Sequence, residues 1–364
     1  MAEKPIILHI VGARPNFMKA APVLRAFEKY PVRQVLVHTG QHYSDNMSEV
    51  FFSELGMQKP DVNLQVGSGS HAQQTAAIMS AFEPVALQYR PALTVVYGDV
   101  NSTVATALVC AKLGLEVVHV EAGLRSFDRE MPEEINRLIT DQLSDLLFTP
   151  SLDGDANLNR EGIAKKKVFF AGNVMIDTLV RFLPAAQQRA AELRNRYGLS
   201  EYGLATIHRP SNVDDLKVLR PLLTALNEIS RNIKLVFPAH PRTLKTMGEE
   251  AEALTANMLR LEPLSYLDFL ALQSSSKVII TDSGGIQEEA TFLGVPCITL
   301  RANTERPITI TQGTNILIGK DLKRLKTEVK KVLAGKKKKR RVPKYWDGHA
   351  AERIAGICWK HLKQ

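Results

Sequence analysis

The feature of this sequence that most constrains its fold is a repeated alternation between short apolar stretches and helical patterns. Residues 6–11, 93–97 and 278–280 are predominantly apolar and rich in β-branched side chains, which is typical of strands buried on both faces. Each stretch ends in small or polar residues, and a helical pattern follows. Because a helix that crosses back between parallel strands covers one face of their sheet, this alternation predicts open, mostly parallel, doubly wound α/β sheets.

The alternation occurs twice along the 364 residues, which suits two domains that each have a core. After Asn173 the pattern becomes long and helical, so we place the hinge there. We expect a first Rossmann-like domain over residues 1–173, on which a C-terminal helix within residues 346–364 packs back. The second should cover residues 174–345. Since ligands of such sheets bind at the carboxyl ends of the strands, we expect the two binding edges to face each other across a cleft.

The net charge is +9, and much of it lies in residues 165–167 and 336–341. Such an excess could indicate binding to nucleic acid or to anionic lipid. Neither run contains aromatic residues, however, and only 6% of the chain is aromatic, which leaves little material for stacking on bases. We interpret residues 336–341 as an exposed, solvated loop and expect no nucleic-acid partner.

The cysteines and the hydropathy pattern indicate the compartment. The three cysteines are widely spaced in apolar surroundings, so we expect core residues rather than ligands or disulfides. No apolar run reaches the ~18 residues of a membrane span. The first residues lead into a strand without the pattern of a secretory signal. We expect a cytoplasmic protein without a membrane partner.

The stretch with the clearest chemistry follows the predicted strand at residues 278–280. Gly284 and Gly285 permit a tight turn close to a ligand, next to Ser283, and a predicted helix begins at Ile286. The free amides and the dipole of a first helical turn suit a phosphate.

Two acids follow, in what we expect to be the first turn of this helix. We interpret Glu288 as a complement to the helix dipole. Glu289 could instead reach a hydroxyl-bearing group beside the phosphate, and a ribose is the obvious candidate.

Charged residues also follow the predicted strands of the first half. Arg14 and Lys19 come after the first strand, where no GxGxxG dinucleotide motif occurs, although Lys19 could also be a surface lysine. Asp99 and Glu121 follow two neighbouring strands. Asp99 alone could be a helix N-cap, but burying a charge at the strand position of Glu121 is costly. We therefore expect both acids to point into one crevice.

A third acid lies in a helix that we expect to begin near Pro132. Glu133 and Arg137 are four residues apart, so an ordinary salt bridge along the helix is an alternative to a role in a site. Both stay candidates.

In the second half, cationic and hydrogen-bonding groups gather at strand ends. Together with the acids of the first half, they suit a nucleoside diphosphate sugar. HExxH, CxxC and GxSxG motifs are absent, so we expect no metal and no hydrolase triad. The candidates in the second half are His208, His240, Arg242, Ser283, Gly284, Gly285, Glu289 and Arg306.

Seven motifs, in order between Ile6 and Gly319, resemble the bacterial and archaeal UDP-N-acetylglucosamine 2-epimerases. They are GARP (12–15), GQH (40–42), YGDVNST (97–103), HVEAGLR (119–125), PEEINR (132–137), TDSGGIQEE (281–289) and TERP (304–307).

The resemblance implies a two-Rossmann fold of the GT-B type, no cofactor, and interconversion of UDP-GlcNAc and UDP-ManNAc. In that family UDP is thought to leave as the proton on carbon 2 is abstracted, and to add back to a glycal intermediate. Asp99, Glu121 and Glu133 match the catalytic acids, and His208 matches the essential histidine. The UDP-binding residues are matched by Arg14, Lys19, Ser283, Gly284, Gly285, Glu289 and Arg306, to which we add Arg137 and His240 as substrate-binding candidates.

Several alternatives stay open within this family outline. Bacterial relatives bind a second UDP-GlcNAc as an activator, but residues 43–46 and 67–71 depart from that pattern, so we doubt such activation here. The chain could also act on a UDP-diacetamido-uronic acid or release free ManNAc. A GT-B glycosyltransferase would share the UDP-binding residues but would not need three acids. We expect a homodimer.

Overall fold

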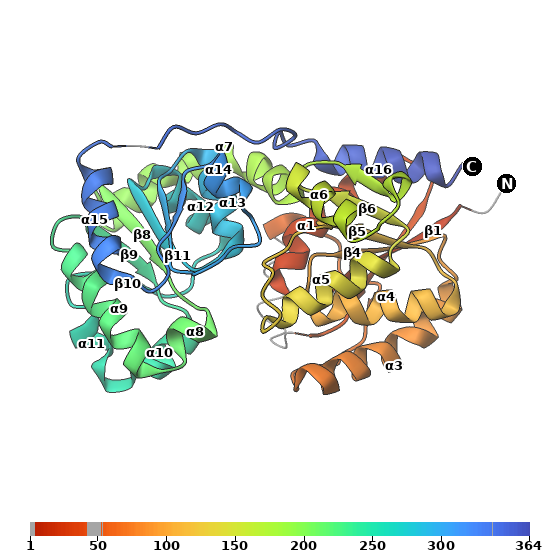
Figure 1. Ribbon diagram of the computed structural model, residues 1–364, viewed down its shortest axis with the longest axis horizontal. Coiled ribbons are helices and arrows are strands. Elements are labelled where there is room, and N and C mark those ends of the chain that lie inside the picture. Colours follow the sequence, from red (N-terminus) through yellow and green to blue (C-terminus); the bar gives the residue numbers. More distant parts are fainter. Residues whose placement is uncertain (1–3, 42–51, 53, 337) are drawn as a thin grey trace. The chain divides into compact units, whose positions relative to one another are not determined.

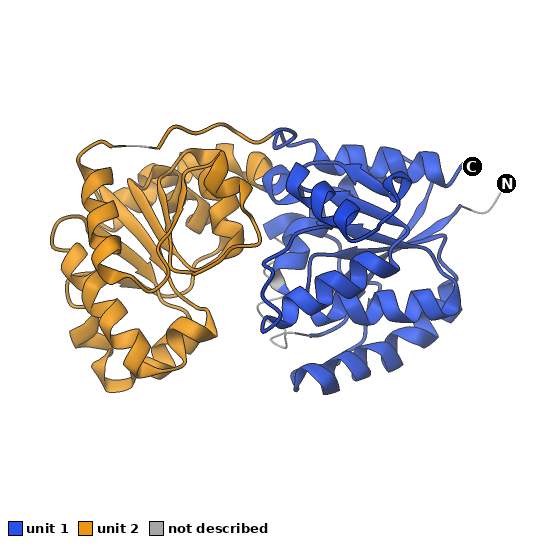
Figure 2. Cartoon of the chain, in the orientation of Figure 1, with its two compact units in different colours: residues 1–178, 344–364 blue, residues 179–343 orange. Residues whose placement is uncertain are grey.

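The computed structural model describes residues 4–41, 52, 54–336 and 338–364, except for the side chain of Arg14. The chain forms two compact units (Figure 2): unit 1 is residues 1–178 with 344–364, and unit 2 is residues 179–343. It passes from unit 1 to unit 2 along helix α7 (Val174–Arg196), which begins directly after the hinge predicted at Asn173.

Unit 1 is built on a seven-stranded parallel sheet in the order β3-β2-β1-β4-β5-β6-β7 (Figure 1). Strands β4 and β5 are buried along their whole length, which explains their predominantly apolar sequences. The strand order reverses between β1 and β4, and at such a switch point doubly wound sheets bind their ligands. The strands are β1 (Ile6–Val11), β2 (Arg33–His38), β3 (Val62–Asn63), β4 (Leu93–Tyr97), β5 (Val117–Val120), β6 (Leu146–Thr149) and β7 (Val168–Phe170).

Helices cover both faces of this sheet, with α6 and α16 on one side of the strands and α3 and α4 on the other (Figure 1). In the described part of the chain, no helix is both long and apolar enough to cross a lipid bilayer. Besides the start of α7, the helices of unit 1 are α1 (Arg14–Phe27), α3 (His71–Tyr89), α4 (Asn101–Leu113), α5 (Pro132–Leu143), α6 (Leu152–Arg160), the 3₁₀ turn η1 (Lys165–Lys167) and α16 (Ala350–His361).

The C-terminal segment is fixed to unit 1 by specific polar contacts. The indole N–H of buried Trp346 donates to the carbonyl of Pro150 at 2.9 Å. The carboxylate of Asp177 accepts hydrogen bonds from the amides of Ala350 and Ala351, at 3.1 and 2.7 Å, and so satisfies the start of α16. Helix α16 then packs against α1.

Unit 2 is built on a six-stranded parallel sheet in the order β10-β9-β8-β11-β12-β13. Both sheets are therefore parallel throughout, and the predicted α/β class is confirmed. The strands are β8 (Tyr202–Thr206), β9 (Lys234–Pro238), β10 (Leu259–Leu261), β11 (Val278–Thr281), β12 (Cys297–Thr299) and β13 (Asn315–Leu317). The helices are α8 (Pro210–Val213), α9 (Leu216–Ile229), α10 (Pro241–Met247), η2 (Gly248–Glu250), α11 (Ala251–Leu254), α12 (Tyr266–Ser275), α13 (Gly284–Leu293), α14 (Ile308–Thr311) and α15 (Leu322–Leu333).

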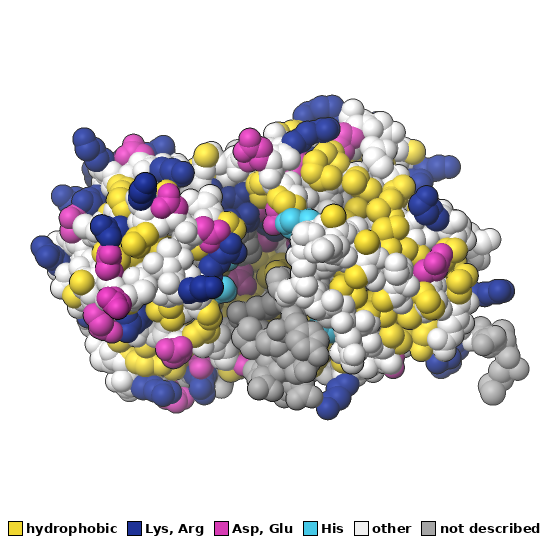
Figure 3. Space-filling model, turned by 90° about the horizontal axis from the view of Figure 1, so that it is seen from below, with side chains coloured by type: hydrophobic (Ala, Val, Ile, Leu, Met, Phe, Trp, Pro, Cys, Tyr) yellow, Lys and Arg dark blue, Asp and Glu magenta, His cyan; other side chains and the backbone are white. Residues whose placement is uncertain are grey.

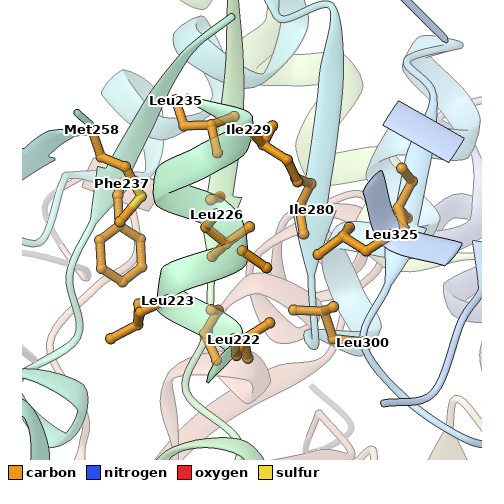
Figure 4. Close-up of a cluster of buried hydrophobic side chains, with 14 of the residues drawn as sticks. Leu222, Leu223, Leu226, Ile229, Leu235, Phe237, Met258, Ile280, Leu300 and Leu325 are labelled. Carbon is orange, nitrogen blue, oxygen red and sulfur yellow. The ribbon is translucent and has the colours of Figure 1, made fainter. Parts of the chain in front are cut away.

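Helix α9 shows how the sequence pattern produces the core of unit 2. Its buried residues recur every three or four positions and therefore share one face. That face belongs to a cluster that includes Phe237 of β9 and Ile280 of β11 (Figure 4). Burying one such side chain stabilises the fold by ~1.5–3 kcal/mol. The buried residues of α9 are Leu219, Leu222, Leu223, Ala225, Leu226 and Ile229.

Two helix boundaries differ from the predictions. Helix α13 begins at Gly284 rather than at Ile286, because Ser283 takes the extended N-cap position and both glycines are already helical. Glu288 therefore lies beyond the first turn, and the expectation that it lies within that turn is wrong. Helix α1 begins at Arg14 rather than near residue 20, since Pro15 is well tolerated in a first turn that needs no amide donor.

The basic run is exposed, as predicted, over residues 336 and 338–341, and Lys337 lies outside the described residues. Two of its side chains also contact the backbone. Arg340 donates to the carbonyl of Thr291 at 3.1 Å, near the end of α13, and Lys338 donates to that of Asn315 at 3.2 Å. A cation near the C-terminal end of a helix complements the helix dipole.

Candidate active site

The ends of β4 and β5 bring a buried ion pair together in unit 1. The ammonium of Lys19, from α1, lies 2.7 Å from Oε1 of Glu121, and the two side chains are 5% and 3% exposed. Burial of Glu121 was predicted and is confirmed. Gly98 makes room for this pair, because a Cβ there would lie 2.5 Å from Nζ of Lys19. Glu121 has a φ of 77°, a strained conformation for a residue other than glycine, and such strain is common at functional sites.

Asp99 is held by an ion pair rather than by a helix cap. The N-cap of α4 is Val100, so the alternative role of Asp99 as that N-cap is wrong. Instead its carboxylate pairs with the guanidinium of Arg137, which also contacts Oε2 of Glu134 at 2.7 Å. Among the ion pairs of the described residues, Arg137 has these two partners and Glu133 is not one of them. The simple Glu133–Arg137 salt bridge is therefore not formed, and Glu133 is half-buried on α5.

Glu134 is a member of this site that the sequence reasoning missed. Its Oε2 accepts from the amide and the hydroxyl of Ser126, both at 2.9 Å, and its Oε1 accepts from the amide of Phe127 at 3.0 Å. Burial alone would raise its pKa, but the Ser126 amide and Arg137 lower that pKa below the ordinary value. The position of Glu134, three residues before Arg137 on a helix, was the signal that could have found it. We call Lys19, Asp99, Glu121, Glu134 and Arg137 the carboxylate cluster.

A second buried network, also missed, fixes the backbone next to Asp99. His119 donates from Nε2 to the carbonyl of Gly98 at 2.8 Å, and its Nδ1 lies 2.7 Å from Asp141. Arg125 lies 2.6 Å from the other oxygen of Asp141. Burial opposes ionisation of Asp141, but His119 and Arg125 lower its pKa below the ordinary value. The signal that could have found His119 was its place in the HVEAGLR motif, two residues before Glu121.

The loop before α1 is tied to the end of β4. The side-chain carbonyl of Asn16 accepts from the amides of Gly12 and Ala13, both at 3.1 Å, and its amide donates to the carbonyl of Tyr97 at 2.8 Å. The side chain of Arg14, His42 and residues 43–46 lie outside the described residues, so their predicted roles stay predictions.

In unit 2, β8 and β11 end side by side and place His208 against Asp282. The Nδ1 atom of His208 lies 3.0 Å from Oδ1 of Asp282, and the same carboxylate accepts from the amides of His208 and Arg209 and from Asn212. Burial opposes ionisation of Asp282, but His208 and Asn212 lower its pKa. Because Nδ1–H of His208 donates to Asp282, Nε2 of the half-exposed ring is left for a ligand or for solvent. Asp282 belongs to the TDSGGIQEE motif, but the sequence did not predict its contact with His208.

The start of α13 offers amides with an arginine beside them. Gly284 and Gly285 are its first residues, and Ser283 makes no capping hydrogen bond with its side chain. A Cβ at Gly284 would lie 2.6 Å from Nη1 of Arg306, so a larger residue there would displace this guanidinium. Arg306 also lies 3.0 Å from Oε1 of Glu288. Glu288 is thus a buried partner of Arg306, and its interpretation as a dipole complement in the first turn is wrong.

Glu305 forms ion pairs with the arginines of this region, and the sequence did not predict this role. Its carboxylate pairs with Arg306, lies 2.8 Å from Arg301 and is 3.8 Å from Arg209. Burial opposes ionisation, but the charges of Arg306 and Arg301 hold the pKa of Glu305 far below its usual range. Three guanidinium groups thus face two carboxylates, Glu305 and Glu288, which leaves one positive charge in excess next to the amides at the start of α13 and suits an anion.

The remaining candidates of unit 2 have different surroundings. Glu289 is buried, and its Oε1 accepts from the hydroxyl of Tyr266 at 3.0 Å, which fixes its orientation. His240 is exposed at the start of α10, with its ring centroid 6.1 Å from that of His208. Arg242 instead forms an exposed ion pair with Asp214, so its guanidinium already has a carboxylate partner at the surface.

Comparison with known proteins identifies the family. The sequence pattern of the family described as UDP-N-acetylglucosamine 2-epimerase matches residues 25–358. The UDP-N-acetylglucosamine 2-epimerase of Methanococcus maripaludis is 41% identical over 97% of this chain and 98% of its own length. The UDP-2,3-diacetamido-2,3-dideoxy-D-glucuronate 2-epimerase of Pseudomonas aeruginosa is 43% identical over 86% of this chain and 88% of its own. The crystal structure of the Methanocaldococcus jannaschii UDP-GlcNAc 2-epimerase in complex with UDP-GlcNAc and UDP matches with a TM-score of 0.90 and 41% identity, covering 98% of this chain and 99% of that chain. The family and the GT-B-like fold expected from the motifs are confirmed: this chain belongs to the UDP-N-acetylglucosamine 2-epimerases.

Proposed function

We propose that this protein interconverts UDP-N-acetylglucosamine and UDP-N-acetylmannosamine without a cofactor, by eliminating UDP and adding it back to a glycal intermediate. The observation that carries the proposal is the pair of acids at adjacent strand ends, Asp99 and Glu121, each held by a buried cation. The family's name supports the substrate class, and this geometry supports the assignment of proton transfer to these acids.

Proton transfer at carbon 2 is assigned to the acids of unit 1. The proton on carbon 2 is weakly acidic, so its removal needs a base that is fixed in place and shielded from water. Glu121 meets both conditions, since it is paired with Lys19 and buried. Asp99 is fixed by Arg137 and is 22% exposed, and half-buried Glu133 lies on α5, the helix that carries Arg137. Inversion at carbon 2 requires that a proton be added to the face opposite the one from which it was removed. Two different acids could carry out these two transfers.

Departure of UDP is assigned to unit 2, where positive groups surround the start of α13. As the bond to the sugar breaks, negative charge develops on the diphosphate, and preorganised amides and cations stabilise it. Gly284 and Gly285 supply amides, Arg306 and His208 supply cationic or donor groups, and Glu289 would bind the ribose hydroxyls. The proposed substrate-binding set is completed by Ser283, His240, Lys19, Arg14 and Arg137.

The test is to incubate the protein with UDP-GlcNAc in heavy water and to follow carbon 2 by NMR. The proposal expects UDP-ManNAc with one deuterium at carbon 2, since the abstracted proton exchanges with solvent before re-addition. Epimerised product without deuterium would refute elimination, and deuterated free ManNAc with released UDP would indicate the hydrolysing reaction instead.

A second candidate substrate has a specific observation in its favour. The Pseudomonas aeruginosa relative named for UDP-2,3-diacetamido-2,3-dideoxy-D-glucuronate is 43% identical, whereas the Methanococcus maripaludis relative named for UDP-N-acetylglucosamine is 41% identical. Assaying both UDP-sugars in parallel decides between them. A kcat/KM at least tenfold higher for the diacetamido sugar would replace the first proposal.

We further propose that the protein is a homodimer in the cytoplasm. Support for the dimer comes from unit 1, where hydrophobic side chains gather on the face seen in Figure 3. Leu87 on α3 is 54% exposed, and Ile135 and Ile139 on α5 are each 36% exposed. Exposed apolar area of this kind is typical of subunit interfaces. Sedimentation equilibrium would test the dimer, and a monomer at micromolar concentration would refute it.

A further inference from the structure

Phe127 combines a strained backbone with an exposed aromatic ring. Its φ is 58°, in the left-handed region that favours glycine, and the residue is 69% exposed. Tyr345 has a similar φ of 62°, but its ring packs on Phe170, with the ring centroids 4.9 Å apart. Within the described part of the chain, no ring contact involves Phe127. The strain at Phe127 is therefore not offset by packing of its side chain in the free protein.

The carboxylate cluster holds Phe127 in this conformation. The amide of Phe127 donates to Glu134 at 3.0 Å, and the preceding Ser126 donates to the same carboxylate through its amide and its hydroxyl. Glu134 in turn contacts Arg137, which pairs with Asp99. The backbone of Phe127 is thus linked through two side chains to a candidate catalytic acid.

The turn itself does not require a phenylalanine. A glycine would satisfy the same hydrogen bonds, which come from the backbone, without strain in the left-handed region. At most of its described positions with positive φ, this chain does use glycine. An exposed phenyl ring also gains nothing from burial. A strained residue with no structural benefit points to a contact that forms only when a ligand binds.

We propose that Phe127 is a specificity-determining residue whose ring packs against the apolar face of the sugar in the UDP-sugar substrate. This inference rests on the proposed function. The sugar, rather than the nucleotide, is assigned because Phe127 belongs to the network that fixes Asp99, whereas the groups suited to phosphate lie around α13 in unit 2. Aromatic side chains commonly line ligand sites and supply apolar contact area there.

The test compares Phe127→Gly, Phe127→Ala and Phe127→Tyr with a matched control, Leu152→Ala, at a position that is 56% exposed in the same unit. For each variant the KM for UDP-GlcNAc, the calorimetric Kd for UDP and the melting temperature are measured. Phe127→Gly is informative because glycine relieves the backbone strain, so this variant should melt within about 2 °C of the wild type or higher. A loss of function in it cannot then be attributed to misfolding.

The proposal expects KM to rise ~10-fold or more in Phe127→Gly and Phe127→Ala, while the Kd for UDP stays within about twofold. Phe127→Tyr and Leu152→Ala should resemble the wild type. An unchanged KM in Phe127→Gly would overturn the proposal. If this variant also lost the dimer, the ring would contact a second copy of the chain rather than the sugar, and the proposal would again be overturned. An equal loss of UDP affinity would overturn the assignment to the sugar.

Failure of the proposed function would be seen separately, in the wild type. If the wild type binds UDP-GlcNAc without converting it, the epimerase proposal fails. The role of Phe127 is then decided by calorimetry with UDP-GlcNAc and UDP. Weaker binding of the sugar nucleotide alone in Phe127→Gly supports that role, and unchanged binding overturns it.

Discussion

Replacing Lys19 by methionine should destabilise the protein strongly, because Lys19 neutralises a carboxylate that is out of contact with water. The ammonium of Lys19 and Oε1 of Glu121 are 2.7 Å apart, and the side chains are 5% and 3% exposed. Removing one partner of a buried pair typically costs about 3–5 kcal/mol, since the remaining charge has lost its compensation. We therefore expect a loss in this range in the free energy of unfolding, measured by urea denaturation monitored within unit 1.

The chain supplies a matched control at the same distance. Lys29 and Glu352 are also 2.7 Å apart, but their side chains are 65% and 51% exposed. Solvent screens such a pair, so Lys29→Met should leave the unfolding midpoint almost unchanged. The comparison isolates burial, because the chemistry and the N–O distance are the same.

A double mutant separates charge compensation from packing. Lys19→Met combined with Glu121→Gln removes both charges, so it should recover much of the stability lost in Lys19→Met, while epimerase activity stays lost. A cost below about 1 kcal/mol for Lys19→Met would refute the reasoning, since only a solvated pair is so weak. Failure of the double mutant to recover stability would show that the ammonium acts through packing.

The remaining predictions concern single side chains. Asp99→Asn and Glu133→Gln should each lower kcat by ~10²–10⁴ in steady-state assays while UDP still binds, because an amide cannot exchange a proton; near-normal turnover would remove that acid from the mechanism. Asp282→Asn should lower kcat ~10-fold or more, because the His208 ring loses the carboxylate that orients it. It should also lower the melting temperature, because the same buried carboxylate accepts from the amides of His208 and Arg209; wild-type kinetics would show that orientation does not matter. Burial raises the pKa of Asp177 to about 6 against the hydrogen bonds from Ala351 and Ala350. Since this pKa is raised on folding, the wild type should lose stability relative to Asp177→Asn as pH rises from about 4 to 7 in parallel denaturation curves, and parallel pH profiles would contradict this assignment. Glu289→Ala should weaken UDP binding by calorimetry, and an unchanged Kd would exclude the ribose contact.

Much of the fold could be predicted because its signals are local. The apolar runs of β4 and β11 are buried on both faces, and the residues that follow them lie at the carboxyl ends of parallel strands. The same rule predicts that Asp99 and Glu121 point into one crevice, because each follows the carboxyl end of one of two neighbouring strands. The start of α13 was predicted two residues late, because a glycine pair reads as a turn although both glycines can also occupy a helical first turn.

The parts that could not be predicted depend on contacts between residues far apart in sequence. They include four acids that each hold another charged group in place: Glu134, Asp141, Asp282 and Glu305. Of the two adjacent acids, Glu134 rather than Glu133 pairs with Arg137, and Glu134 is also held by hydrogen bonds from Ser126 and Phe127 in the preceding loop. Sequence spacing alone allows both, because positions three and four apart share a helix face.

The return of residues 344–364 to unit 1 has a consequence for synthesis on the ribosome. Unit 1 is discontinuous in sequence, so the growing chain delivers all of unit 2 before the last helix of unit 1 exists. Until then, the side of α1 that α16 covers has no partner, and the place of Trp346 beside Pro150 is vacant. Nascent unit 1 therefore stays incomplete while unit 2 is synthesised. A fragment that stops before Lys344 should be prone to aggregation, even though it carries every residue of the candidate site.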